Sequence, residues 1–176
     1  MDRIRRAECR TWLALVLGMA LVSGAEAEVA PVSPLGMVEV RVDVELSCPS
    51  CAQGLERRLG RLDHVARVEV QSDEGQIVLV PDPGEALDLG EVRQVIRNAG
   101  FLPAGIWLAA VGRVRLVQGV PVLALSGDSA ITFAAGDKID KLVAAADDGI
   151  VRVMGLMLDP GEGDAELLCV TAFDPL

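Results

Sequence analysis

The sequence lacks the residue groups of the common enzyme active sites. It has one histidine, and no serine–histidine–aspartate set, glycine-rich phosphate loop or carboxylate pair with a positioned partner stands out. Basic residues are also scarce, because 16 Lys and Arg stand against 26 Asp and Glu and leave a formal net charge of −10. The phosphates of nucleic acids require a basic surface. We therefore expect neither an enzyme nor a nucleic-acid-binding protein.

Residues 1–27 have the pattern of a secretory signal peptide. Four arginines in the first ten residues precede the apolar run 11–24, and an Ala-Glu-Ala end offers small residues to a signal peptidase. The run is short for a bilayer span and is followed at once by Glu26 and Glu28. No cysteine follows it directly, which argues against a lipoprotein anchor. We expect an exported protein, periplasmic or secreted, that meets the membrane only through this segment; a retained single-span anchor is the alternative.

The part that remains after cleavage has too few cysteines for a disulfide framework. It contains Cys48, Cys51 and Cys169, an odd number that cannot all pair within one chain. Cys48 and Cys51 form a Cys-Pro-Ser-Cys motif, which can be a disulfide, a redox couple or part of a metal site. Cys169 lies in an apolar segment, where we expect a buried thiol that packs like a small hydrophobic residue.

Residues 37–110 predict the element order strand, helix, strand, strand, helix, strand, after a linker at 28–36. Apolar residues alternate over 37–46, as in a strand with one wet face, and then recur at helical spacing from Cys51 to Leu62. Two further strands flank a tight turn at 72–75, and a second helix ends before Gly100. The last strand covers 101–110. This order is that of a ferredoxin-like βαββαβ domain with both helices on one face of an antiparallel sheet.

From residue 111 the pattern changes to that of a small β-rich domain. Three short apolar segments precede a helix that starts at Asp137, as its N-cap, and stops at Gly149. Two more strands follow, up to the C-terminus. Three strands, a helix and two strands are the element order of an OB-like barrel, and an unrelated β-rich domain is the alternative. The predicted fold class is α+β, with a ferredoxin-like domain at 37–110 and a small barrel domain at 111–176.

The cysteine pair lies in the connection between the first strand and the first helix. The helix is expected to start near Cys51, whose thiolate the unpaired amides and positive dipole end of the helix favour. We expect Cys48 to be exposed on the loop and Cys51 to point toward the apolar side of the helix. Two soft thiolates at this spacing suit Cu(I) or Hg(II), bound nearly linearly.

The segment Glu-Leu-Ser-Cys-Pro-Ser-Cys at 45–51, in this element order, resembles the metal loop of the heavy-metal-associated domain. That family includes copper chaperones and the periplasmic mercury-binding protein, and its loop usually reads Gly-Met-Thr-Cys-x-x-Cys. The resemblance implies that Cys48 and Cys51 bind the metal, that Leu46 replaces the methionine packed under the site, and that Ser47 replaces the threonine. Asn-Ala-Gly-Phe at 98–101 resembles the end of the family's final helix, so Phe101 is expected beside the metal loop.

The residues and the resemblance together predict an exported metal-binding protein or metallochaperone. It would hold Cu(I) or Hg(II) between two cysteines and pass the ion to a partner protein by thiolate exchange. One alternative is a thioredoxin-like dithiol redox module, although that fold usually has an aromatic residue where Ser47 stands. A purely structural disulfide and a non-catalytic interaction module that uses the C-terminal barrel are the others.

Four further residues are predicted to be structural. His64, the single histidine, is expected in a surface turn at the far end of the first helix from Cys51. Met154 and Met157 would lie on opposite faces of one strand and pack in the core. Trp107 is expected as a core aromatic near the junction of the two domains.

Overall fold

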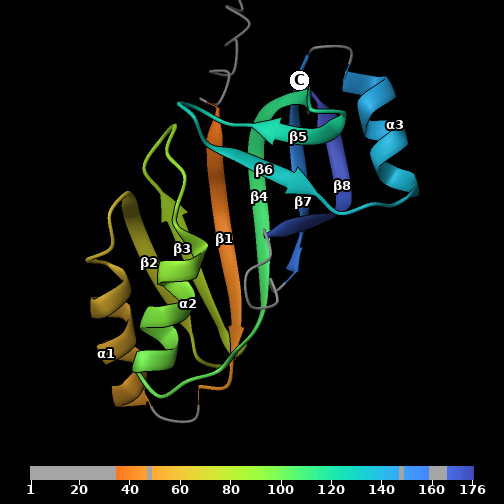
Figure 1. Cartoon of the computed structure of the whole chain (residues 1–176). Helices are drawn as coiled ribbons and strands as arrows, with labels where there is room; N and C mark the ends of the chain where they lie inside the picture. The colour runs from red at the N-terminus through yellow and green to blue at the C-terminus, as the bar shows by residue number, and fades with distance from the viewer. Residues whose placement is uncertain (1–34, 47–48, 147–148, 159–165) are drawn as a thin grey trace, which may run out of the picture. The chain divides into compact units, whose positions relative to one another are not determined.

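The computed structural model describes residues 35–46, 49–146, 149–158 and 166–176. These residues form a mixed α+β fold in which eight strands make one sheet and five of the strands close into a barrel (Figure 1). None of the helices in the described ranges is long and apolar enough to cross a membrane. The elements are β1 (Gly36–Val44), α1 (Pro49–Leu59), β2 (Val65–Gln71), β3 (Gln76–Pro81), α2 (Leu89–Asn98), β4 (Pro103–Val117), β5 (Val120–Ala124), β6 (Ala130–Phe133), α3 (Asp137–Ala146), β7 (Ile150–Leu158) and β8 (Leu167–Pro175).

The first half of the chain forms antiparallel strands in the order β2-β3-β1-β4. Helices α1 and α2 pack side by side against one face of these strands (Figure 1). The core lies between them and contains Val42, Leu55, Leu59, Ile77 and Ile96, each at most 1% exposed. The predicted element order of this half is therefore confirmed.

The alternation predicted for the first strand is confirmed in its second half and fails at its start. Val40, Val42 and Val44 are at most 3% exposed. The register of β1 against β4 shifts between Met37 and Glu39, so Met37 is buried and Val38 is 36% exposed. A one-residue bulge reverses the face to which the preceding residues point.

Strand β4 is shared by the two parts of the sheet. It pairs with β1 from Pro103 to Val111, with β7 from Ile106 to Arg113 and with β5 from Arg113 to Val117. The predicted boundary between residues 110 and 111 falls inside this one strand, where the sequence suggests two separate segments. Whether residues 37–110 fold alone stays a prediction.

Gly112 explains how one strand can belong to both parts of the sheet. It is buried, and a Cβ there would lie 2.6 Å from the carbonyl oxygen of Ala124 on β5. A glycine in a strand interior often marks a site of close backbone approach or a barrel corner. In Figure 1, β4 runs beside β1 and then bends over toward β5. In the sequence Gly112 suggests a break between two elements, but in the structure it lies at a bend within the single strand β4.

The second half of the chain closes the barrel. Its strands follow the order β4-β5-β6-β8-β7, and the β4–β7 pairing closes the ring. All of these pairs are antiparallel except β6 with β8. The predicted helix is α3, which begins at Asp137 and ends at Ala146, before the predicted stop at Gly149.

Two predictions of core side chains are wrong for one shared reason. Trp107 is 39% exposed and Met154 is 40% exposed, on the face of the sheet that α1 and α2 leave open. The indole Nε1 of Trp107 donates a hydrogen bond to Asp43 Oδ2 at 3.2 Å. Met157 is 5% exposed, so the prediction of opposite faces for the two methionines is confirmed.

Cys169 is also exposed, contrary to the prediction of a buried thiol. Its neighbours Leu168 and Val170 on β8 point inward and are at most 7% exposed. Successive side chains of a strand alternate between its faces, so an apolar segment still exposes every second residue. The apolar character of this segment therefore did not decide the position of the thiol.

Candidate metal centre

Cys51 lies in the first turn of α1 and is exposed. The helix begins at Pro49, before the predicted start, and its buried stripe consists of Ala52, Leu55 and Leu59. The prediction that Cys51 points toward the apolar side is therefore wrong, because Ala52 occupies that position. An exposed cysteine in the first turn of a helix, where the helix dipole favours negative charge, can be reached by an ion or by the thiol of another protein.

The residues directly before this turn, Ser47 and Cys48, lie outside the described residues. Their predicted roles in the site stay predictions. Leu46, on the other side of the gap, is half-buried and packs against the hydrophobic core. Glu45 is exposed, as predicted for the wet face of the first strand.

Three chain segments meet where β1 ends. The amide of Val44 donates to the carbonyl of Gly75 at 2.8 Å, which fixes the β2–β3 turn beside the end of β1. On its other side Val44 pairs with Pro103, the first residue of β4. The loop that contains the cysteine pair therefore starts between the β2–β3 turn and the segment that enters β4.

Phe101 belongs to that entering segment, and backbone hydrogen bonds determine its position. Gly100 has a φ of +90° and donates its amide to Arg97 O at 2.9 Å, while the Phe101 amide reaches Ile96 O at 3.2 Å. These two bonds form a Schellman motif, which explains the glycine after α2. Phe101 is half-buried against the core, two residues before Pro103. It lies at the same end of the sheet as the cysteine loop.

Among the described residues no group of three or more His, Cys, Asp and Glu side chains could hold a metal ion. Asp43, near the end of β1, accepts hydrogen bonds from Gln76 Nε2 at 2.9 Å and from Trp107. This Trp107–Asp43 contact could not be predicted from the sequence, because it joins residues on two different strands.

His64 lies in the turn before β2, as predicted. Its φ is +64°, and its Nδ1 is 3.6 Å from Glu85 Oε2. The length of β2 separates it from the turn beside Val44, roughly 20 Å at the usual rise of a strand. The imidazole therefore lies at the opposite end of β2 from the end of β1, where the cysteine loop starts.

Comparison with known proteins agrees with this geometry. Residues 41–101 match the family model of the heavy-metal-associated domain. No curated protein and no solved structure matches the chain. The matched stretch runs from β1 to Phe101 and includes the cysteine loop and both helices. Domains of this family bind metal ions and are typically not enzymes. Residues 41–101 of this chain thus belong to the heavy-metal-associated domain family.

Proposed function

We propose that the protein is an exported soft-metal carrier that holds Cu(I) or Hg(II) between Cys48 and Cys51. The observation that carries this proposal is the exposed Cys51 in the first turn of α1, within a heavy-metal-associated domain. Cys48 precedes it by three residues, so the two thiolates come from one short loop. The ion is the cargo of the protein.

The choice of a soft ion follows from the ligands near the loop. Zinc prefers four ligands in a tetrahedron. Glu45 is exposed just after β1, His64 is at the other end of β2, and the Asp43 carboxylate already accepts two hydrogen bonds. Cu(I) and Hg(II) are satisfied by two thiolates in a nearly linear arrangement, so they need no further group from this chain.

Transfer to a partner protein follows from the same coordination. A two-coordinate ion can accept a third thiolate before it releases the first, so the ion need not pass through water. The exposure of Cys51 supports such an exchange, because an incoming thiol must reach the metal. On this proposal the protein is not an enzyme, and the signal-like residues 1–27 direct it to the periplasm or the exterior.

The strand orders support the assignment of two domains, one ferredoxin-like and one OB-like. The order β2-β3-β1-β4 is the one expected of a ferredoxin-like domain, and β4-β5-β6-β8-β7 with α3 before β7 suits an OB-like barrel. We propose that residues 37–110 and 111–176 are these two domains, with β4 continuing from one into the other.

Competition with a chromophoric Cu(I) chelator under anaerobic, reducing conditions tests the proposal. Cys48→Ser and Cys51→Ser should each abolish tight Cu(I) binding. Cys169→Ser is the matched control, because it removes another exposed cysteine that lies on the barrel, and His64→Ala is the second control. Both controls should retain the wild-type affinity.

A parallel zinc titration on the same samples tests the selectivity. Tighter binding of zinc than of Cu(I) by the monomer would contradict the two-thiolate site, and so would a large loss of Cu(I) affinity in His64→Ala. A protein that binds neither ion but cycles between dithiol and disulfide with a defined reduction potential would be the redox module instead.

A further inference from the structure

Strand β2 forms the outer edge of the eight-stranded sheet. It pairs with β3 and with no other strand in the described part of the chain. A register shift at Ala66 is followed by a regular ladder from Arg67 to Gln71. An edge strand presents unpaired amides and carbonyls that can bond to another strand. The sheet can therefore be extended at β2.

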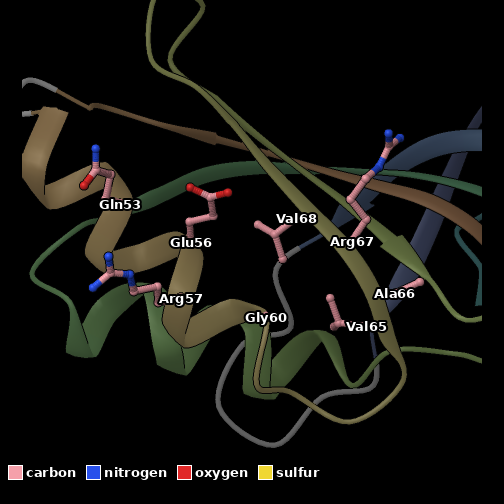
Figure 2. Close-up of a pocket in the computed structure, with 8 residues that line it drawn as sticks. All are labelled: Gln53, Glu56, Arg57, Gly60, Val65, Ala66, Arg67 and Val68. Carbon is pink, nitrogen blue, oxygen red and sulfur yellow. The ribbon is translucent and has the colours of Figure 1, made fainter.

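A groove of about 490 Å³ follows this edge on the side of the sheet covered by the helices. Figure 2 shows Val68 turned toward Glu56 and α1, whereas Arg67 points away from the helix. Val68 and Val70 are half-buried on the helix side, and Arg67 and Glu69 are exposed on the open side. A strand added at this edge would place its helix-side residues in the groove.

We infer that the strand added here is β2 of a second copy of this chain, antiparallel and centred on Val68. In that register Arg67 lies opposite Glu69 of the second copy, and Glu69 lies opposite its Arg67. Opposite charges directly across two strands are stabilising, and like charges are destabilising. Registers centred on Arg67 or Glu69 would place a charge opposite itself, so the side chains select the register centred on Val68.

The helix side of the groove also carries one charge of each sign. Glu56 and Arg57 of α1 line it, and a two-fold axis through Val68 brings α1 of both copies to the same face of the joined sheet. Two glutamates and two arginines thus make the edge locally neutral in a chain with a net charge of −10. Symmetric dimers require a surface that complements itself, and this edge meets that requirement.

The dimer does not use the end of β1, from which the cysteine loop leaves the sheet. Gln71, the last residue of β2, pairs with Gln76, which also pairs with Asp43 near the end of β1. The loop after β1 is therefore at one end of β2, and antiparallel pairing places the two loops at opposite ends of the seam. This inference does not depend on the proposed function, and association should need no metal.

Sedimentation velocity of the purified full chain over a range of concentrations, with chelator and reductant present, measures the association. The wild-type protein should form a dimer in a concentration-dependent manner. Arg67→Glu and Glu69→Arg should each raise the dissociation constant by about tenfold or more, because two attractive pairs become two repulsive ones. An equimolar mixture of the two variants should associate as well as wild type, because one chain then offers two glutamates and the other two arginines.

Arg115→Glu is the control for charge, since Arg115 is an exposed arginine on the barrel part of β4. It should leave the dissociation constant unchanged, and circular dichroism should show that all variants are folded. A protein that stays monomeric at all concentrations overturns the inference. If Arg67→Glu or Glu69→Arg dimerises as well as wild type, the inference is also wrong. The same holds if the mixture of the two variants fails to associate.

Discussion

Arg93 on α2 forms an ion pair with Glu166, the residue before β8. Removing Glu166 should lower the free energy of unfolding more than removing Arg93. The Arg93 side chain is 8% exposed and the Glu166 side chain 30% exposed. Glu166→Ala leaves a nearly buried guanidinium without a counter-charge, and breaking a buried pair in this way costs about 3 kcal/mol. Arg93→Met leaves a carboxylate that water can reach and keeps an apolar stem, so it should cost only about 1 kcal/mol.

Urea unfolding, followed by far-UV circular dichroism and by the fluorescence of Trp107 on β4, measures these costs. The double variant Arg93→Met/Glu166→Ala should be close to Arg93→Met alone, which gives an interaction energy of about 3 kcal/mol. Arg115→Met, which removes an exposed arginine, should change the free energy of unfolding by less than about 0.5 kcal/mol. Equal costs for the two single variants, or additive costs in the double variant, would refute the reasoning.

Residues 28–110 expressed alone should unfold cooperatively, because the strands and the two helices of this segment bury Val42, Leu55 and Ile96 between them; a fragment without dispersed amide signals would put the boundary in the wrong place. Gly155→Ala should lower the free energy of unfolding by about 3 kcal/mol, since the added Cβ would overlap the carbonyl of Cys169; an unchanged melting temperature contradicts this. Only protein with both loop thiols reduced should bind Cu(I), and undiminished binding by fully oxidised protein, checked by thiol counting, would rule out the dithiolate site. Intact mass should place the mature N-terminus near Glu28, and retention of the first 27 residues would favour the anchor.

The order of the elements was predictable because the signals for it are local. The turn at 72–75 and the glycine after α2 appear in the structure where the sequence puts them, with φ of +64° at Gly75 and +90° at Gly100. Both depend on residues within a few positions of the turn. The motif around Phe101 is local in the same sense, because the Schellman hydrogen bonds span only Ile96 to Phe101.

The burial of single side chains was less predictable because it depends on distant elements. Trp107 and Cys169 lie in apolar strands, yet both are exposed because no described helix covers their face of the sheet. Val38 is exposed because a bulge against β4 changes its direction. Cys51 lies outside the buried stripe of α1, because Ala52 takes the buried position in its first turns. None of these facts can be read from the spacing within one segment.

The contacts that position the candidate metal site are separate from those that join it to the barrel. The site end of the sheet is held by the Val44–Gly75 hydrogen bond and by the Schellman motif before Phe101. Neither involves a residue beyond Pro103. The Arg93–Glu166 pair, in contrast, connects α2 to the residue directly before β8. Stability and metal affinity should therefore respond to different substitutions.

Glu166→Ala should lower the free energy of unfolding and leave the Cu(I) affinity of the folded protein within about twofold of wild type, because it changes no group at the site end of the sheet. Cys51→Ser should do the reverse, since an exposed side chain contributes little to the core but is one of two proposed ligands. Chelator competition at a temperature where both variants are fully folded, paired with urea unfolding of the same samples, measures the two effects independently. If Glu166→Ala weakens Cu(I) binding as strongly as Cys51→Ser does, the barrel takes part in holding the metal loop, and the separation of the two sets of contacts is wrong.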